Sequence, residues 1–159
     1  MTSIYTVERK RTIEAPVERV YPLVADLTQW TRWSPWEDLD PELQRAYSGT
    51  DAGVGQVYAW SGNRKAGAGR MEITGAEDDR MVEVDVRFEK PFKSQSTSTF
   101  TFAPEGDGTM VTWRMTGARP ALMRITQKVF DMDNLMGKDF EKGLDRMALV
   151  APPPDPGHA

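Results

Sequence analysis

The chain has 159 residues, which is enough for one domain with a sizeable core and too few for two. Apolar residues make up 39% and charged residues 28%, and the formal net charge is −4, so the composition is that of a globular protein and excludes a disordered chain. There is no cysteine, and the single histidine, His158, lies in a proline-rich tail, which excludes disulfides, thiolate or imidazole metal ligands and a Ser-His-Asp triad. We expect one domain over residues 1–150, a disordered tail over 151–159, and neither metal nor cofactor.

The same composition limits the partners and the location of the protein. An acidic chain is a poor binder of nucleic acid, and the densest basic cluster, Glu8-Arg9-Lys10-Arg11, lies between apolar residues like the solvated face of a strand. No apolar run approaches the roughly 18 residues of a membrane span, and the segment MTSIYTVERK lacks the apolar core of a signal peptide. We therefore expect a cytoplasmic protein with no nucleic-acid partner and no integral membrane anchor.

The first predicted elements are a strand and a helix. Residues 7–14 alternate apolar and polar side chains and end at Ala15-Pro16, where a proline suits the first turn of a helix. The apolar residues that follow recur at intervals of three and four, which predicts an amphipathic helix; they are Val17, Val20, Leu23, Val24 and Leu27. Pro22 lies inside this pattern and removes one backbone donor, so we expect the helix to bend there.

The segment WTRWSPW, residues 30–36, carries three tryptophans at intervals of three. Three functions are conceivable for it: a ligand surface, a stacking platform for nucleic acid, or the cover of a core. Its single arginine and the four acidic residues among the next six argue against nucleic-acid stacking. Trp30 and Trp33 can share one face of a helical turn and anchor it to the core, whereas Pro35 ends the turn and leaves Trp36 as a candidate residue of a cavity mouth.

Six further strands are predicted, over residues 43–48, 56–61, 69–74, 80–89, 94–102 and 109–116. The connections between them are rich in glycine and aspartate, which favour tight turns, so the pattern is that of antiparallel hairpins. Alternation assigns a set of side chains to the apolar face of the sheet: Val82, Val84, Val86, Phe88, Val111, Trp113 and Met115. Phe100 and Phe102 share their face with Ser96 and Ser98, which leaves small polar groups along the interior.

After Pro120 the apolar period becomes helical for roughly 30 residues. The apolar stripe consists of Leu122, Ile125, Val129, Met132, Met136, Phe140, Leu144 and Met147. Gly137 and Gly143 interrupt it, and we expect a bend or break near Gly137. These elements predict an α+β fold in which a curved antiparallel sheet of about seven strands wraps around a long C-terminal helix.

Several motifs within this order of elements match a known family. The opening motif is Ala15-Pro16-x-x-x-Val20-Tyr21-x-Leu23-Val24-x-Asp26-x-x-x-Trp30-x-x-Trp33-Ser34-Pro35-Trp36. Later motifs are Tyr47-Ser48-Gly49, Gly53-Val54-Gly55, Tyr58-x-Trp60-x-Gly62-Asn63, Gly67-x-Gly69-x-Met71-x-Ile73 and Gly137-Lys138-Asp139-Phe140-Glu141-Lys142-Gly143-Leu144. Together, from about Tyr5 to Met147, they resemble the polyketide cyclase/dehydrase-like bacterial branch of the SRPBCC (START-like, helix-grip) superfamily.

The resemblance implies a helix-grip fold with two short helical segments after the first strand and a cavity between the sheet and the long helix. It also implies a hydrophobic ligand such as a lipid or polyketide, which some members cyclise or dehydrate. Two departures stand out. The N-terminal hydrophobic anchor of many members is missing, and residues 90–94 and 119–127 match the pattern poorly, so they are candidates for shaping the cavity entrance.

An internal apolar cavity is the leading hypothesis for the site, because a curved sheet and a helix do not close perfectly over one another. The candidates for its sheet side are Tyr58, Trp60, Met71, Ile73, Val84, Val86, Phe88, Phe100, Trp113 and Met115. The candidates for its helix side are Met132, Met136 and Phe140, and Trp36 is the candidate for its mouth. The alternative for each residue is ordinary packing in the core.

Acid–base catalysis in such a cavity would need a carboxylate or a tyrosine with a shifted pKa. Tyr58 and Asp139 are the candidates, and each has a structural alternative: a core aromatic for Tyr58 and a solvated helix residue for Asp139. The segment 131–134 suggests a calcium loop, but the required positions five and twelve would be Leu135 and Lys142, which are not oxygen ligands of that kind. The glycine-rich segment 62–69 has no phosphate-binding motif and is predicted to be a hairpin loop.

Three functions remain open from the sequence, and we favour the first. The first is a carrier or sensor of a hydrophobic small molecule, the second is an enzyme of the cyclase/dehydratase kind that uses neither metal nor histidine, and the third is a protein-binding module like the co-chaperones of the superfamily. An open cavity without convergent titratable groups favours the carrier, a polar pair deep in the cavity favours the enzyme, and a closed cavity with a broad exposed apolar patch favours the co-chaperone. The sequence carries no signal about the oligomeric state.

Overall fold

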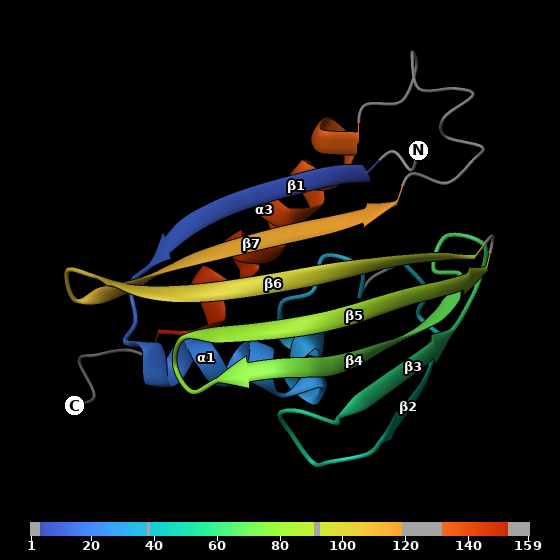
Figure 1. Cartoon of the computed structure of the whole chain (residues 1–159), viewed down its shortest axis with the longest axis horizontal. Coiled ribbons are helices and arrows are strands. Elements are labelled where there is room, and N and C mark those ends of the chain that lie inside the picture. Colours follow the sequence, from blue (N-terminus) through green and yellow to red (C-terminus); the bar gives the residue numbers. More distant parts are fainter. Residues whose placement is uncertain (1–3, 38, 91–92, 119–131, 153–159) are drawn as a thin grey trace.

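The structure, a computed structural model, describes residues 4–37, 39–90, 93–118 and 132–152. Its strands are β1 (Ile4–Ile13), β2 (Gln44–Ser48), β3 (Val57–Ser61), β4 (Ala68–Glu77), β5 (Met81–Lys90), β6 (Ser94–Glu105) and β7 (Gly108–Ala118). They form one antiparallel sheet in the order β1-β7-β6-β5-β4-β3-β2 (Figure 1). The strands from β2 to β7 are therefore a meander of hairpins, as the glycine- and aspartate-rich connections predicted, and β1 pairs with the last strand.

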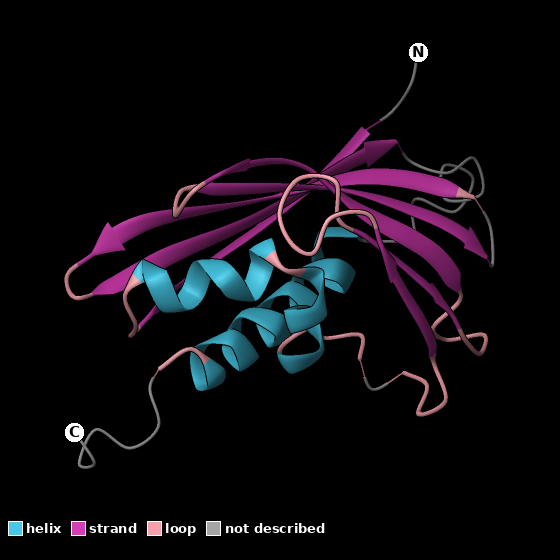
Figure 2. Cartoon of the chain, turned by 90° about the horizontal axis from the view of Figure 1, so that it is seen from below, coloured by secondary structure: helices cyan, strands magenta, loops and turns pink. Residues whose placement is uncertain are grey.

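The helices lie against one face of this curved sheet (Figure 2). They are α1 (Val17–Ala25), the 3-10 helix η1 (Leu27–Arg32) and α3 (Met132–Val150). Asp26 separates α1 from η1, and its carboxylate accepts a hydrogen bond of 3.0 Å from the backbone N–H of Thr28, which caps η1. Pro22 lies inside α1 without ending it. Two short helical segments thus follow β1, and the architecture is the helix-grip fold.

The alternation of apolar and polar residues places the core on the helix-covered face. The side chains of Val82, Val84, Val111 and Trp113 have 0% of their surface exposed, whereas Phe88, at the end of the same apolar row, is 36% exposed. The connections after β4 and β6 are shorter than expected, because residues 75–77 continue β4 and residues 103–105 continue β6 instead of forming loops. The pairing of β4 with β5 shifts by one residue between Ile73 and Gly75. This β-bulge lets β4 continue beyond its glycine.

Trp30 and Trp33 anchor η1 to the core, as their spacing predicted. They are 3% and 0% exposed, and both rings meet Phe100 edge-on at centroid distances of 5.6 and 5.8 Å. Each indole N–H is satisfied by a carbonyl of α1: Trp30 donates to Val24 at 3.0 Å and Trp33 to Leu23 at 2.7 Å. These hydrogen bonds let two large amphipathic rings be buried without an unpaired donor.

The predicted break near Gly137 is wrong, because α3 runs without interruption through Gly137 and Gly143. Both glycines serve close packing instead. A Cβ on Gly137 would collide with the guanidinium of Arg9 on β1, and one on Gly143 would lie 3.0 Å from Pro35 and 3.1 Å from the ring of Trp113. A glycine in a helix can therefore indicate a near neighbour and not a break in the helix.

Three sequence-based expectations fall largely outside the described residues. These are the helical stripe from Leu122 to Val129, the poorly matching segment 119–127, and most of the expected tail. Of that tail, Ala151 is described and is only 4% exposed, so the packed part of the chain extends at least one residue beyond the expected boundary. Within the described residues, no helix combines the length and the apolarity needed to cross a membrane.

Candidate functional site

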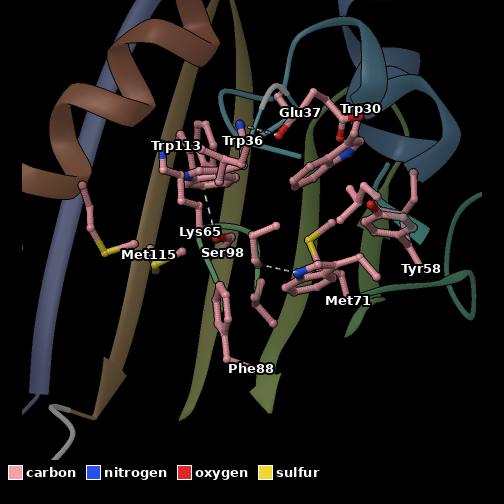
Figure 3. Close-up of a pocket in the computed structure, with 18 of the residues that line it drawn as sticks. Trp30, Trp36, Glu37, Tyr58, Lys65, Met71, Phe88, Ser98, Trp113 and Met115 are labelled. Atoms are coloured by element: carbon pink, nitrogen blue, oxygen red, sulfur yellow. Dashed lines mark hydrogen bonds between the residues drawn. The ribbon is translucent and has the colours of Figure 1, made fainter. Parts of the chain in front are cut away.

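A cavity of about 220 Å³ lies between the helix-covered face of the sheet and the segment that follows η1. Figure 3 shows its walls, with aromatic rings and methionine side chains turned toward a common space. The lining residues come from most of the elements of the fold: Leu27, Trp30, Ser34, Trp36, Glu37, Leu39, Leu43, Tyr47, Tyr58, Trp60, Lys65, Ala66, Met71, Val86, Phe88, Ser98, Trp113, Met115 and Met136. Its volume is below the roughly 300–1,000 Å³ typical of small-molecule sites.

One wall of the cavity is a row of aromatic rings across β2, β3 and β5. Tyr47 stacks on Tyr58 with a centroid distance of 5.0 Å, and Tyr58 stacks on Trp60 at 5.9 Å. Phe88 then meets Trp60 edge-on at 5.3 Å. The strand register creates this row, because Tyr47 pairs directly with Tyr58, and Trp60 pairs with Gly69, whose missing side chain leaves room for the indole.

The opposite wall consists of Trp36, Trp113 and the residues that hold them. Trp113 stacks flat on Phe140 of α3, with the ring centroids 4.0 Å apart and the planes at 3°. Its indole N–H donates to the hydroxyl of Ser98 at 3.3 Å, which gives the small polar residue in the apolar row of β6 a structural role. Trp36 meets Trp113 edge-on at 5.7 Å and donates from Nε1 to the carboxylate of Asp139 at 3.2 Å.

A polar cluster lies at the tyrosine end of the cavity. Glu37 accepts a hydrogen bond of 2.5 Å from Arg45, and the side chain of Glu37 is only 14% exposed. Burial raises the pKa of Tyr58 to about 12, helped by the negative charge of Glu37, whereas the charge of Arg45 and a hydrogen bond from it act in the opposite direction. Burial and Glu37 also raise the pKa of Tyr47. Both phenols are therefore neutral at neutral pH and can donate hydrogen bonds.

The two residues singled out for catalysis occupy different places. Tyr58 lines the cavity and is 7% exposed, but its raised pKa makes it a poor proton acceptor near neutral pH. Asp139 is not among the lining residues; it lies behind Trp36 and accepts the indole hydrogen bond. The titratable side chains that do line the cavity are Glu37, Tyr47, Tyr58 and Lys65. Lys65 is exposed, and Glu37 is paired with Arg45.

The structure brings together one part of the predicted cavity set. Lining the cavity are Trp36, Tyr58, Trp60, Met71, Val86, Phe88, Trp113, Met115 and Met136. Four other candidates are fully buried and lie outside the lining: Ile73, Val84, Phe100 and Phe140. They face the same side of the sheet or helix, but Trp30, Trp33 and Trp113 pack over Phe100, and Trp113 covers Phe140. Met132 begins α3, and its side chain lies outside the described residues.

Sequence reasoning missed ten lining residues, most of which lie in connections, in η1 or in the edge strand β2. They are Leu27, Trp30, Ser34, Glu37, Leu39, Leu43, Tyr47, Lys65, Ala66 and Ser98. Trp30, which its spacing predicts to be a core anchor, both packs in the core and lines the cavity. Connections show no periodicity, so no pattern marks Glu37 or Leu39 as facing inward, whereas Ser98 was visible in the sequence as a polar residue in an apolar row. Among the described residues, no group of three or more acidic, histidine or cysteine side chains is placed to hold a metal ion.

Comparison with known proteins identifies one family. The family model for polyketide cyclases/dehydrases and lipid transport proteins matches residues 5–151, which include nearly all of the described structure. A search of curated protein sequences finds no match to this chain.

Solved structures with the same fold are numerous, and their sequences have diverged far from this one. A protein from Chromobacterium violaceum has a TM-score of 0.65 and 18% identity, over 93% of this chain and 97% of that chain. A protein from Micromonospora echinospora has a TM-score of 0.59 and 20% identity, over 96% of this chain and 87% of that chain. Norcoclaurine synthase from Thalictrum flavum, in complex with dopamine and hydroxybenzaldehyde, has a TM-score of 0.67 and 11% identity, over 94% and 87%. At such identities the similarity establishes the fold.

Proposed function

Because this chain belongs to the polyketide cyclase/dehydrase and lipid transport family, we propose that it binds a hydrophobic small molecule in the cavity beneath its sheet and acts as a carrier or sensor of that molecule. The observation that supports this proposal best is the lining of the cavity. Aromatic, aliphatic and methionine side chains make up most of it, and burying an apolar ligand against them is worth about 25 cal/mol for each Å² removed from water. Flexible methionines adapt to irregular ligands.

The polar groups of the lining support binding more than a reaction. Glu37 is paired with Arg45, Ser98 accepts from the indole of Trp113, and the hydroxyl of Ser34 accepts from the backbone N–H of Trp36 at 3.3 Å. A general base of the cyclase/dehydratase alternative would have to come from this set, and the raised pKa of Tyr58 argues against its serving as one. The co-chaperone alternative needs a broad exposed apolar patch, but among the described residues two of the exposed large apolar side chains, Tyr47 and Phe88, line the cavity.

Native mass spectrometry of the protein purified from its own host tests the proposal. We expect a small hydrophobic molecule to remain bound, and a library of lipids and aromatic compounds to give binders when the purified protein is empty. A protein that is always empty and binds no library compound would overturn the carrier function. Turnover of a library compound, lost in Tyr58→Phe, would establish the enzyme instead.

Two variants at neighbouring residues of β5, one that blocks the cavity and one matched control, test where the ligand binds. Val86→Phe places a larger side chain in the lining of the cavity and should abolish binding. Arg87→Phe adds the same ring at the next residue of β5, on the exposed face, and should bind as the unchanged protein does. Equal binding by both variants would show that the ligand sits elsewhere on the molecule. Circular dichroism and a thermal melt of each variant verify that it is folded.

A further inference from the structure

We infer that the ligand of this cavity is a flat molecule of one or two rings that carries a neutral hydroxyl group, and not a polycyclic compound or a long acyl chain. This inference rests on the proposed function and narrows it. Three properties of the cavity support it: its volume, the parallel rings on one wall, and the absence of net charge in its polar cluster.

The volume limits the size of the ligand. An engineered protein cavity of about 150 Å³ holds one benzene molecule, and the cavity here is about 220 Å³. One substituted ring or two fused rings fill such a space, whereas a third ring must project past the exposed rings of Tyr47 and Phe88 or push the lining apart. The lining resists this, because Trp113 is fixed between Phe140 and Ser98, and Trp60 is held by a hydrogen bond of 3.0 Å from its indole to the carbonyl of Ala66.

The wall formed by Tyr47, Tyr58 and Trp60 favours a flat ligand. Successive rings in this row are inclined by only 26° and 21° to one another, so they present similar orientations. Trp36 and Trp113 provide rings on the facing wall, edge-on to each other at 82°. A planar ligand between the two walls can make edge-on contacts with rings on both sides, which is one of the preferred geometries of aromatic pairs. An aliphatic chain gains no such contacts.

The polar cluster matches a neutral hydroxyl better than a charged group. The charge of Glu37 is compensated by Arg45, so this end of the cavity offers hydrogen-bonding groups without net charge. Tyr47 and Tyr58 add two neutral phenols to it, since burial raises the pKa of each. A carboxylate would lose its hydration there, and the cation of the lining that could pair with it is the exposed Lys65. Pairs that involve exposed charges contribute little.

A series of fluorescent or calorimetric titrations tests the size limit. The probes are phenol, 2-naphthol and 2-anthrol, which add one ring at a time to the same hydroxyl group, together with hexadecanoic acid. We expect 2-naphthol to bind most tightly, and 2-anthrol and hexadecanoic acid to bind about tenfold more weakly or worse, because each overfills the cavity. Equal or tighter binding of 2-anthrol or hexadecanoic acid would overturn the size limit while leaving the proposed function intact. Failure of every probe, with an empty protein from the host, would overturn both.

Two variants separate the size of the cavity from the stability of the protein. Phe88→Ala removes a ring at the exposed mouth and should improve 2-anthrol binding several-fold relative to 2-naphthol. Ile73→Val shortens a fully buried residue that does not line the cavity, and should leave the ratio of the two affinities unchanged. A ratio that is unaffected by Phe88→Ala, or that changes equally in Ile73→Val, would contradict the assigned boundary of the cavity.

A second probe set tests the hydroxyl group. We expect 2-naphthol to bind about fivefold more tightly than naphthalene, the effect of one hydrogen bond, and more tightly than 2-naphthoate at neutral pH. In Tyr58→Phe this advantage over naphthalene should shrink while the affinity for naphthalene itself stays the same; Tyr47→Phe serves as the second variant if Tyr58→Phe does not fold. Tighter binding of 2-naphthoate, or a loss in Tyr58→Phe that is equal for naphthalene and 2-naphthol, would overturn the neutral-hydroxyl assignment.

Discussion

The indole Nε1 of Trp36 donates a hydrogen bond to the carboxylate of Asp139 at 3.2 Å, across 103 positions of the chain. This contact joins the segment after η1 to α3 and fixes the ring that closes one side of the cavity. It also explains why Asp139 does not line the cavity, because its carboxylate is engaged behind the indole. Asp139, a candidate for catalysis, and Trp36, a candidate for the cavity mouth, thus form a single structural unit.

The first prediction concerns this unit. Trp36→Phe keeps an aromatic ring and removes the donor, so the free energy of unfolding should fall by about 1 kcal/mol, measured by urea denaturation. Asp139→Ala should cost a similar amount, and the double variant should lose clearly less than the sum of the two single losses. Fully additive losses would show that the hydrogen bond contributes nothing to stability.

The second prediction concerns Gln56, which is 1% exposed and joins three segments. Its side-chain oxygen accepts from the backbone N–H of Leu27 at 2.6 Å, and its amide donates to Asp26 and to the carbonyl of Asp51, both at 3.0 Å. Gln56→Leu leaves a buried N–H without a partner, so we expect a loss of about 2–3 kcal/mol in a denaturant titration. The control Gln44→Leu alters an exposed residue of β2 and should change stability by no more than about 0.5 kcal/mol. Equal effects of the two variants would show that the hydrogen bonds of Gln56 do not stabilise the protein.

The third prediction compares two glycines of the same strand. A Cβ on Gly69 would collide with the backbone carbonyl of Arg87 and lie 2.7 Å from the ring of Trp60, whereas one on Gly75 would lie at an ordinary 3.4 Å from Glu83. Gly69→Ala should therefore destabilise the protein by about 1–3 kcal/mol and displace Trp60 from the cavity wall, while Gly75→Ala should stay within about 0.5 kcal/mol. Thermal melts and tryptophan emission spectra measure both effects. An unchanged emission in Gly69→Ala would mean that the wall accommodates the methyl group.

The fourth prediction concerns alkaline pH. The pKa of Tyr58 is about 12 in the folded protein, against an ordinary value of 10.0, so the unfolded chain loses this proton first. The contribution to stability is fully present below about pH 10 and should be lost progressively as the pH rises to about 12. Denaturant titrations across this range should show a shallower decline for Tyr58→Phe than for the unchanged protein. The difference between the ultraviolet titrations of the unchanged protein and of Tyr58→Phe gives the pKa of this phenol among the four tyrosines, and a value near 10 for Tyr58 would contradict the prediction.

Much of the fold was predictable because it depends on local patterns. Alternation along β5 places Val82 and Val84 inside, and the glycine- and aspartate-rich connections mark the hairpins, since both signals are contained within a few neighbouring residues. The extent of β4 and the continuity of α3 were not predictable from such patterns. In both cases a glycine would normally signal a turn or a break. Here Gly75 lies at a β-bulge, and Gly137 leaves room for the side chain of Arg9.

The sequence by itself determined which side chains are apolar, which of them share a face of a strand or helix, and that Trp30 and Trp33 face the core. Only the tertiary structure decided which of those side chains border empty space. Ile73 and Met71 have the same parity on one strand, yet Met71 lines the cavity and Ile73 does not. The reason is that a cavity is what remains when segments distant in sequence fail to fill a volume, and Glu37, Tyr47 and Lys65 reach it from connections and an edge strand that carry no periodic signal.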